Sequence, residues 1–357
     1  MTTLTCESDA GQTARPGRGS PDASAVDPAD FVDPRRPGSW SRQVAALLEA
    51  GHYRAAYEVL AEKVPYVENQ LRYFAESLAG VENHWSRTHD WMARFIDDGR
   101  PQRILDVGCA VGCHAIAFAR KGHQTWGVDI LPRMIQRGRE VADSLGLSRR
   151  VHLVEGDIRR LETCFDEGFF DAAVACNIFE HLDDAALSEV LAGLRRVVRP
   201  GGRLVIETSP GRYYYWFEPK RRKLIALTAP LAWLPDRLFS MYVRGLDRLL
   251  MRAVLRQPPS LYGHEPGHIN CMDHQHLARL MRSAGLAEVR TFAVHAHPGM
   301  KDEGCMRARW TRLLFGRKSI ACRNVFGIAT VPPAGGRAAR PLENAAALTS
   351  SVRNESR

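Results

Sequence analysis

The stretch ILDVGCAVG, residues 104–112, is an apolar segment that runs into closely spaced glycines. An apolar strand followed by a glycine turn and a helical pattern is typical of a nucleotide-binding loop in a parallel sheet. The dinucleotide spacing G-x-G-x-x-G would need glycines at 108, 110 and 113, but the chain has Gly108, Ala110 and Cys113. The loop thus departs from the dinucleotide pattern, and the rest of the chain must identify its ligand.

Short apolar runs alternate with helical patterns through the middle of the chain. Strands that alternate with helices predict a parallel sheet with helices on both faces. Ligands of such a sheet bind at the carboxyl ends of its strands. The predicted strands are 103–107, 125–129, 151–155, 171–176, 203–208, 286–295 and a last one near 319–330, and the predicted helices are 112–121, 132–145, 182–197 and 273–284.

The chain divides further by composition. Residues 1–38 and 332–357 are rich in small residues and proline, with too few large apolar residues to form a core, so we expect disordered tails. Residues 39–99 carry helical apolar stripes, which predict an N-terminal helical cap. Residues 100–331 form the predicted binding domain, interrupted after its fifth strand by a basic, aromatic and helical insertion at 211–262, interpreted as a lid.

Composition indicates a soluble globular protein of the reducing cytoplasm. The 357 residues are 45% hydrophobic, and the start lacks the basic-then-apolar order of a signal peptide. The eight cysteines show no zinc-type Cys-x-x-Cys pair, which favours free thiols over a disulfide scaffold. Between Arg212 and Arg256 the chain has ten Lys/Arg residues but only three acidic ones. Such a cluster forms either a solvated helix face or a surface for nucleic acid, anionic lipid or an acidic substrate.

Residues suited to binding adenosine follow the first three strands. Gly108 lies where a side chain would collide with a bound cofactor, and Gly112 opens a helix whose N-terminal N–H groups can face a ligand. Asp129 ends the second strand 21 residues after Gly108, close to the spacing of an acid that binds both ribose hydroxyls. After the third strand, Asp157 can accept from the exocyclic amine of adenine while Ile158 packs on the ring.

Five segments, LDVGCAVG, VDI, EGDI, CNIFEHL and RPGG, follow one another in this order. In order and spacing the chain resembles the class I S-adenosylmethionine-dependent methyltransferases, especially the small-molecule branch that includes ubiquinone- and menaquinone-type enzymes. The resemblance covers residues from about 100 to 295 and departs from the usual glycine at Ala110, where alanine is a common substitute. It implies a Rossmann-like α/β fold, methyltransferase activity and S-adenosylmethionine as the cofactor.

The resemblance also assigns roles to single residues. Asp106 and Gly108 would lie by the methionine part of the cofactor, and Asn177 near its sulfonium. For each aspartate, the alternative is an ordinary turn or N-cap residue at a strand end. The expected cofactor-binding residues are Asp106, Gly108, Gly112, Asp129, Ile130, Asp157, Ile158 and Asn177.

Methyl transfer requires a nucleophile in line with the C–S bond, and an oxygen nucleophile generally needs a base. Histidine suits this role because its pKa lies near neutrality. His268, shortly before a helix for which Asp273 is the predicted N-cap, is the first candidate, and His181 is the second. The alternative for His268 is a hydrogen bond to a loop.

The letters of residues 264–268, HEPGH, match the metalloprotease motif H-E-x-x-H. That motif binds zinc only on a helix, where both histidines share a face. Pro266 followed by Gly267 predicts a turn instead. No metal site is therefore predicted.

Aromatic side chains are the candidates for binding the methyl acceptor. Tyr214 and Trp216 belong to a run of five aromatics after the fifth strand, and Trp85 lies on the N-terminal helices, which in the resembled family often close over the ligands. An aromatic-lined pocket would suit a planar or apolar small molecule. The alternatives are that the run anchors the insertion and that Trp85 packs in the core.

The main functional prediction is methyl transfer to an oxygen or nitrogen of a small molecule, in bacterial secondary metabolism. Residues 220–234, a basic cluster beside apolar residues, would instead suit an enzyme of lipid-linked acceptors at a membrane surface. A third interpretation is a non-catalytic module that binds the cofactor and regulates a partner. Nucleic acid ranks lower because residues 177–180, NIFE, lack the Pro-Pro-aromatic sequence of base-methylating enzymes. The oligomeric state is left open, a homodimer included.

Overall fold

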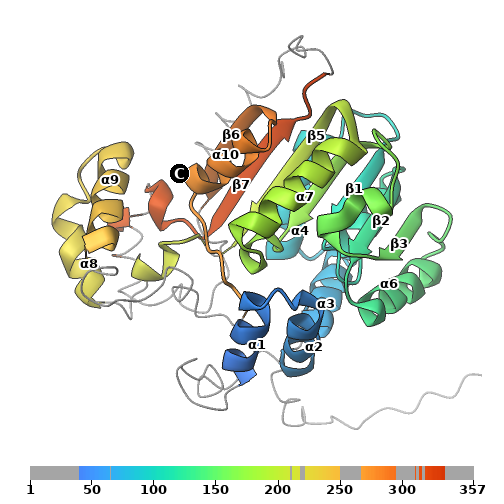
Figure 1. Ribbon diagram of the computed structural model, residues 1–357, viewed down its shortest axis with the longest axis horizontal. Coiled ribbons are helices and arrows are strands. Elements are labelled where there is room, and N and C mark those ends of the chain that lie inside the picture. Colours follow the sequence, from blue (N-terminus) through green and yellow to red (C-terminus); the bar gives the residue numbers. More distant parts are fainter. Residues whose placement is uncertain are drawn as a thin grey trace, which may run out of the picture.

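The computed structural model contains the predicted sheet, with seven strands in the order β3-β2-β1-β4-β5-β7-β6 (Figure 1). β7 runs antiparallel to β5 and β6, so the sheet is mixed, whereas the other strand pairs are parallel. The structure describes residues 40–64, 66–209, 211–217, 222–249, 267–294, 310, 313–315 and 318–333. The strands are β1 (Arg103–Val107), β2 (Gln124–Asp129), β3 (Val151–Glu155), β4 (Phe170–Cys176), β5 (Val198–Thr208), β6 (Ala287–Val294) and β7 (Asn324–Thr330).

The central strands consist of apolar residues because both of their faces are covered. Ile104 and Leu105 of β1 are 1% and 0% exposed, although neighbours on a strand point to opposite faces of the sheet. Residues 172–175 of β4 are buried in the same way. Near-continuous burial of this kind is typical of parallel strands between two helical layers.

Helices cover both faces of the sheet (Figure 1). On one face, α4 and α5 pack against Ile104 and Val205 through Phe95 and Phe118. On the other face, α7 and α10 pack against the neighbouring Leu105 and Leu204. The helices of these layers are α4 (His84–Ile96), α5 (Cys113–Arg120), α6 (Pro132–Ser144), α7 (Asp184–Val197) and α10 (His274–Ser283).

The helix α10 begins as the sequence predicts. Asp273 accepts hydrogen bonds from the backbone N–H groups of Gln275 and His276 through Oδ1, at 3.0 and 2.8 Å. These bonds satisfy donors that have no partner inside the first turn of a helix. Leu277 and Met281 are fully buried in the main core, which fixes the segment before α10 against the sheet.

The predicted N-terminal cap is helical and shares the core of the sheet. Val44, Leu48 and Leu60 are at most 1% exposed and pack in the same cluster as Leu105 of β1. Figure 1 shows the first three helices gathered at one end of the sheet. They are α1 (Trp40–Glu49), α2 (Tyr53–Lys63) and α3 (Tyr66–Leu78).

The described part of the insertion packs with residues from later in the chain into a small lobe, whose apolar core is built around Trp216, Phe217, Phe239 and Phe315. Its helices α8 and α9 lie to one side of the sheet (Figure 1, left). The predicted tails lie outside the described residues, apart from positions 332 and 333. The elements of the lobe are η3 (Tyr214–Phe217), α8 (Arg222–Thr228), η4 (Ala229–Leu231), α9 (Asp236–Asp247) and η7 (Ser319–Ala321).

Within the described ranges, no helix combines the length and apolarity needed to cross a membrane. Six of the eight cysteines belong to these ranges, and all six are free thiols, as predicted. The other two, Cys6 and Cys305, lie outside the described residues.

Candidate active site

A cavity of about 890 Å³ lies at the carboxyl ends of β1, β2, β3 and β4. The loops after these strands form one wall, and residues from α2, α3 and the start of α4 form another. The strand order reverses between β1 and β4, and ligands of open α/β sheets bind at such a switch point. The sequence-predicted residues that line the cavity are Gly108, Asp129, Ile130, Asp157, Ile158, Asn177, His181 and His268.

The loop after β1 uses left-handed backbone conformations. Gly108 and Gly112 have φ of +66° and +71°. A Cβ at Gly108 would lie 2.6 Å from Cγ1 of Ile178, so this position has no room for a side chain even without a cofactor. Ala110 also has a positive φ, 47°, which costs a residue with a Cβ about 1–2 kcal/mol. Ala110 therefore adopts a backbone conformation that favours glycine, and the strain of this conformation destabilises the folded state.

Replacing Ala110 by glycine is expected to raise the free energy of unfolding by about 1 kcal/mol. Glycine adopts a positive φ without a Cβ clash, and the greater entropy of the unfolded chain offsets part of this gain. Urea denaturation measures the change. Ala117→Gly, inside α5, is the matched control and should lower the free energy of unfolding by about 1 kcal/mol. Equal destabilisation by both substitutions would show that Ala110 carries no strain.

Asp129 fixes the loop against the end of β2. Its Oδ2 accepts a hydrogen bond from the N–H of Ala110 at 2.8 Å, and its Oδ1 accepts one from the N–H of Leu131 at 2.9 Å. Burial raises the pKa of this carboxyl, and the backbone hydrogen bonds oppose that shift. Each carboxylate oxygen can accept a second hydrogen bond, so the group can also bind a vicinal diol in the cavity.

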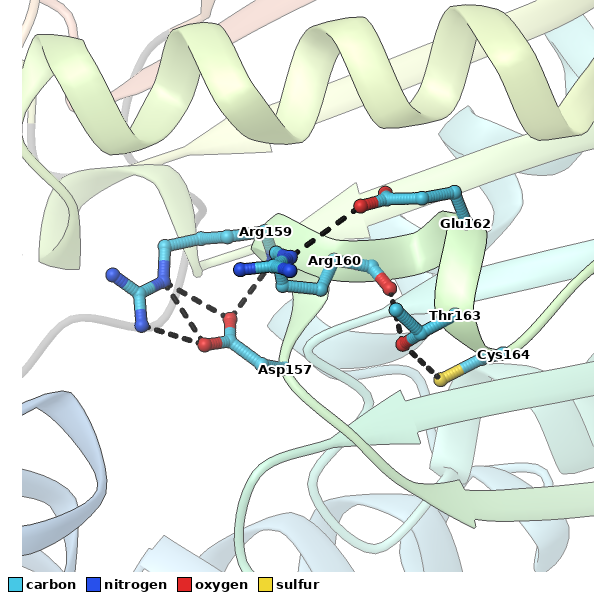
Figure 2. Close-up of polar contacts among 6 residues, drawn as sticks. All are labelled: Asp157, Arg159, Arg160, Glu162, Thr163 and Cys164. Atoms are coloured by element: carbon cyan, nitrogen blue, oxygen red, sulfur yellow. Dashed lines mark hydrogen bonds and ion pairs between the residues drawn. The ribbon is translucent and has the colours of Figure 1, made fainter.

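Asp157 lies at the start of η1 (Ile158–Thr163), where its carboxylate is shared with Arg159 (Figure 2). Its Oδ1 accepts from the backbone N–H of Arg159 at 2.9 Å, and its Oδ2 lies 2.6 Å from Nη2 of the same residue. Burial alone would raise the pKa of Asp157, but the hydrogen bonds and charge of Arg159 lower it. Arg159 also stacks over the ring of Tyr53 at 4.6 Å. Asp157 is therefore an N-cap, and an adenine amine would share its carboxylate with Arg159.

Asn177 follows β4 with a φ of +51°. With its amide oriented to match its neighbours, the NH₂ group donates to Oε2 of Glu207 at 3.1 Å and to Oε1 of Glu180 at 3.3 Å. Glu207 on β5 is completely buried, and burial raises its pKa to about 7. The backbone N–H of Asn177 donates to the carbonyl oxygen of Glu207 at 3.0 Å. Two buried acids thus hold Asn177 at the cavity wall.

Two predicted cofactor residues, Asp106 and Gly112, are not among the residues that line the cavity. Asp106 is 2% exposed, and its Oδ2 accepts from the N–H of Ala115 in the first turn of α5 at 3.2 Å. Gly112 is the N-cap of α5, where a Cβ would lie 2.9 Å from Leu153. We therefore assign both residues a supporting role beneath the loop in place of direct contact with a ligand.

The carboxyl of Asp106 should make stability depend on pH, because burial raises its pKa to about 7. Between about pH 4 and pH 7, the folded state keeps a proton that the unfolded state has lost. The group therefore lowers the free energy of unfolding as pH rises, by at most about 1.4 kcal/mol per pH unit. Asp106→Asn cannot ionise, so its stability relative to the parent should increase over this range. Urea unfolding across that pH range measures the difference, and a pH-independent difference would contradict the assignment.

Glu180, His181 and His268 meet beside Asn177. Glu180 and His181 belong to η2 (Phe179–His181), and His268 lies in the segment before α10. The backbone N–H of Ile269 donates to the carbonyl oxygen of Glu180 at 2.9 Å, which ties the two segments together. The rings of His181 and His268 are 4.7 Å apart between centroids, at an angle of 73°.

The surroundings of His268 do not favour its predicted role as a general base. Burial and, to a smaller extent, the charge of Arg323 lower its pKa to about 3. The ring is neutral at physiological pH, but so weak a base provides little driving force for removing a hydroxyl proton. Of the motif at 264–268, the first three residues lie outside the described part of the chain.

The aromatic residues predicted to bind the acceptor, Tyr214, Trp216 and Trp85, are not among the residues that line this cavity. Trp216 is 3% exposed and packs in the core of the insertion. Trp85 is 8% exposed and stacks on His114. Tyr214 lies 5.8 Å from the guanidinium of Arg323, which does line the cavity. Because no described residue of the insertion lines the cavity, the lid interpretation is not supported for this part.

The cap supplies aromatic residues that the sequence did not single out as ligand-binding. Tyr53 and Tyr57 of α2 and Tyr73 of α3 line the cavity. Tyr57 is in edge contact with the ring of His181, at 5.6 Å between centroids. The only feature of the sequence that could have indicated these cavity residues is the presence of several tyrosines on short helices just before the glycine loop. Arg323 comes from the segment before β7, far along the chain, and local patterns give no sign of it.

Comparison with known proteins identifies the domain around the cavity. Residues 104–202 match the methyltransferase-domain family. A probable tocopherol O-methyltransferase of Oryza sativa subsp. japonica is 33% identical over 142 residues, 39% of this chain and 35% of that protein. A ubiquinone biosynthesis O-methyltransferase of Xanthomonas oryzae pv. oryzae is 32% identical over 108 residues, 30% of this chain and 42% of that protein. The chain thus spans well under half the length of these curated relatives.

Among solved structures, the geranyl diphosphate C-methyltransferase of Streptomyces coelicolor A3(2) is 16% identical, with a TM-score of 0.44, over 69% of this chain and 78% of that chain. The family match includes the glycine loop and the strand ends that carry Asp129, Asp157 and Asn177. Residues 104–202, which carry these strand ends, therefore match a methyltransferase domain.

Proposed function

We propose that the protein transfers a methyl group from S-adenosylmethionine to an oxygen or nitrogen of a small molecule, in the cytoplasm and in bacterial secondary metabolism. One observation carries this proposal, namely that six cofactor residues predicted from four separate strand ends converge on one cavity. They are Gly108, Asp129, Ile130, Asp157, Ile158 and Asn177.

The cavity residues fit this cofactor. Asp129 would accept hydrogen bonds from the ribose hydroxyls, and Ile158 would pack on the adenine ring. The lack of a side chain at Gly108 lets the backbone approach the methionine part. Once bound, the cofactor supplies a methyl group on a positively charged sulfur, and the carboxylates of Asp129 and Glu180 on the cavity wall favour that charge.

The remaining task of the chain is to orient the acceptor and to exclude water. Residues of α2 and α3 line the cavity opposite the strand ends and would contribute to both tasks. His181 and His268 would meet the acceptor atom beside Asn177. Alignment of a nucleophile with the C–S bond can by itself provide a large part of the rate enhancement.

A methyl-transfer assay tests the proposal. The full-length chain is incubated with methyl-labelled S-adenosylmethionine and panels of phenols, apolar alcohols, sugars and amines, and release of S-adenosylhomocysteine is measured. Turnover is expected with at least one acceptor class, and it should be lost in Asp129→Ala. Cofactor binding without transfer to any class would favour the non-catalytic regulatory module instead.

The insertion favours a second candidate acceptor, a lipid-linked molecule at a membrane surface. Trp233, Leu238 and Met241 are 77%, 50% and 60% exposed, and the exposed Arg237 and Arg248 lie near them in the sequence. Exposed apolar side chains flanked by basic ones suit the interface of an anionic membrane. Co-sedimentation with anionic and neutral vesicles separates the candidates, because only a lipid-linked acceptor predicts binding that Trp233→Ser and Met241→Ser weaken together.

A further inference from the structure

We propose that Glu180, His181 and His268 bind a divalent transition-metal ion of the Zn²⁺ or Fe²⁺ type. One ligand atom from each of the three lies within 4.8 Å of the other two, and all three residues are buried. Two imidazoles and one carboxylate form the ligand set of open catalytic sites for these ions. Mg²⁺ and Ca²⁺ fit less well because they prefer ligand sets made of oxygen.

The spacing of the cluster suits such an ion. Ligand atoms at about 2.1 Å from a tetrahedral ion lie about 3.4 Å from one another. The three ligand atoms lie within 4.8 Å of one another, so side-chain rotation would have to draw them together around an ion. The three side chains also line the cavity, so positions on the ion that the protein does not fill would face the space for a second ligand.

Outer hydrogen bonds hold two of the ligands as they do in known metal sites. Nδ1 of His181 lies 3.0 Å from the carbonyl oxygen of Gly267, which can only accept, so Nδ1 carries the proton and Nε2 keeps its lone pair. Oε2 of Glu180 accepts from the hydroxyl of Thr208 at 2.8 Å. Metal-binding histidines and carboxylates typically have such partners, which orient them toward the ion.

The cavity holds groups that would favour a bound cation and one group that would oppose it. The carboxyl group of Glu180 is buried and offers an oxygen ligand, and His181 and His268 offer imidazole nitrogens. Arg323 lines the same cavity, and its positive charge opposes cation binding. The ligand bonds must outweigh this repulsion, and the measured affinity reports that balance.

This set differs from the H-E-x-x-H letters at 264–268, for which the sequence predicts no site because Pro266 followed by Gly267 predicts a turn. Only His268 is common to both, and the other two ligands come from η2. The sequence could not indicate the set, because it forms only where two distant segments meet.

The catalytic part of this inference rests on the proposed function. An ion beside Asn177 would lower the pKa of an acceptor hydroxyl and so favour the nucleophilic oxyanion. The hydroxyl proton would pass to water as the acceptor binds, before the transfer. The oxygen electron pair would then form the new C–O bond, and the electron pair of the broken C–S bond would stay on sulfur. The products are the methyl ether and neutral S-adenosylhomocysteine.

Metal binding can be measured without any methyl transfer. Untagged full-length protein is stripped with a chelator and titrated with ZnCl₂ by calorimetry, and with Co²⁺ by visible absorbance. We expect one ion per chain and the d–d bands of a Co²⁺ site with nitrogen and oxygen ligands. Glu180→Gln and His268→Ala should each weaken binding more than about a hundredfold, and Thr208→Val about tenfold or more. Circular dichroism and thermal unfolding verify that each variant is folded.

His84→Asn is the matched control, because His84 lines the same cavity outside the cluster. Its affinity for Zn²⁺ should equal that of the parent. The absence of stoichiometric binding, or equal binding by the parent and a folded cluster variant, would overturn the inference. S-adenosylmethionine is titrated into the same metal-free protein in parallel. Cofactor binding without metal binding removes only this inference, whereas metal binding without cofactor binding removes only the proposed function.

Discussion

Replacing Asp129 by alanine is expected to weaken S-adenosylmethionine binding by at least about a hundredfold. The carboxylate lies at the end of β2 and lines the cavity, and in the proposed function it would accept from both ribose hydroxyls. Hydrogen bonds to a charged group contribute about 1.5–3 kcal/mol each, and every 1.4 kcal/mol is a factor of ten in affinity. Equilibrium dialysis with labelled cofactor measures the loss.

A control variant separates the loss of the cofactor contact from a disturbance of the loop. Asp129 also accepts from the N–H groups of Ala110 and Leu131, so its removal disturbs the loop as well as the cofactor contact. Asp129→Asn keeps one acceptor oxygen and should show an intermediate loss of affinity. Parent-like binding by a folded Asp129→Ala protein would show that the ribose lies elsewhere.

Replacing Gly108 by alanine is expected to lower the free energy of unfolding by about 2–5 kcal/mol. A left-handed residue with a Cβ costs about 1–2 kcal/mol, and overpacking costs about 1–3 kcal/mol more. Both apply here, because φ is +66° and the added Cβ would lie 2.6 Å from Cγ1 of Ile178. Urea denaturation measures the change.

The two causes can be separated with Ile178→Ala. This substitution removes the atoms that a new Cβ at Gly108 would meet, so the double variant should be less destabilised than the sum of the single variants. The remaining loss would be the cost of the backbone conformation alone. Strict additivity would show that Ile178 plays no part in excluding a side chain from the loop.

Much of the fold could be predicted from local patterns. β1 begins and ends where its apolar run does, and the helix after Asp273 begins at its predicted cap. These elements are predictable because burial on both faces, or a side chain that satisfies the first N–H groups of a helix, leaves a local signature. The antiparallel direction of β7 left no such signature, because the sequence of a single strand does not determine which strand it pairs with or in which direction.

The candidate site could be predicted only in part, for the same reason. Residues at strand ends, such as Asp129 and Asn177, were found because their position relative to a strand fixes where they lie. Aromatic residues could not be placed from the sequence, because a buried anchor such as Trp216 and a pocket wall have the same composition. The pairing of Asp157 with Arg159 and the meeting of His181 with His268 depend on loop conformation and on distant segments.

The most direct test of the central claim is calorimetric titration of the unmodified full-length chain with S-adenosylmethionine and S-adenosylhomocysteine. The convergence of four strand ends on one cavity predicts one binding site per chain. The dissociation constants of both ligands are expected to be on the order of micromolar, because a small number of hydrogen bonds would hold the cofactor. The absence of binding by a folded protein, with and without Zn²⁺, would contradict the claim that this cavity is a cofactor site.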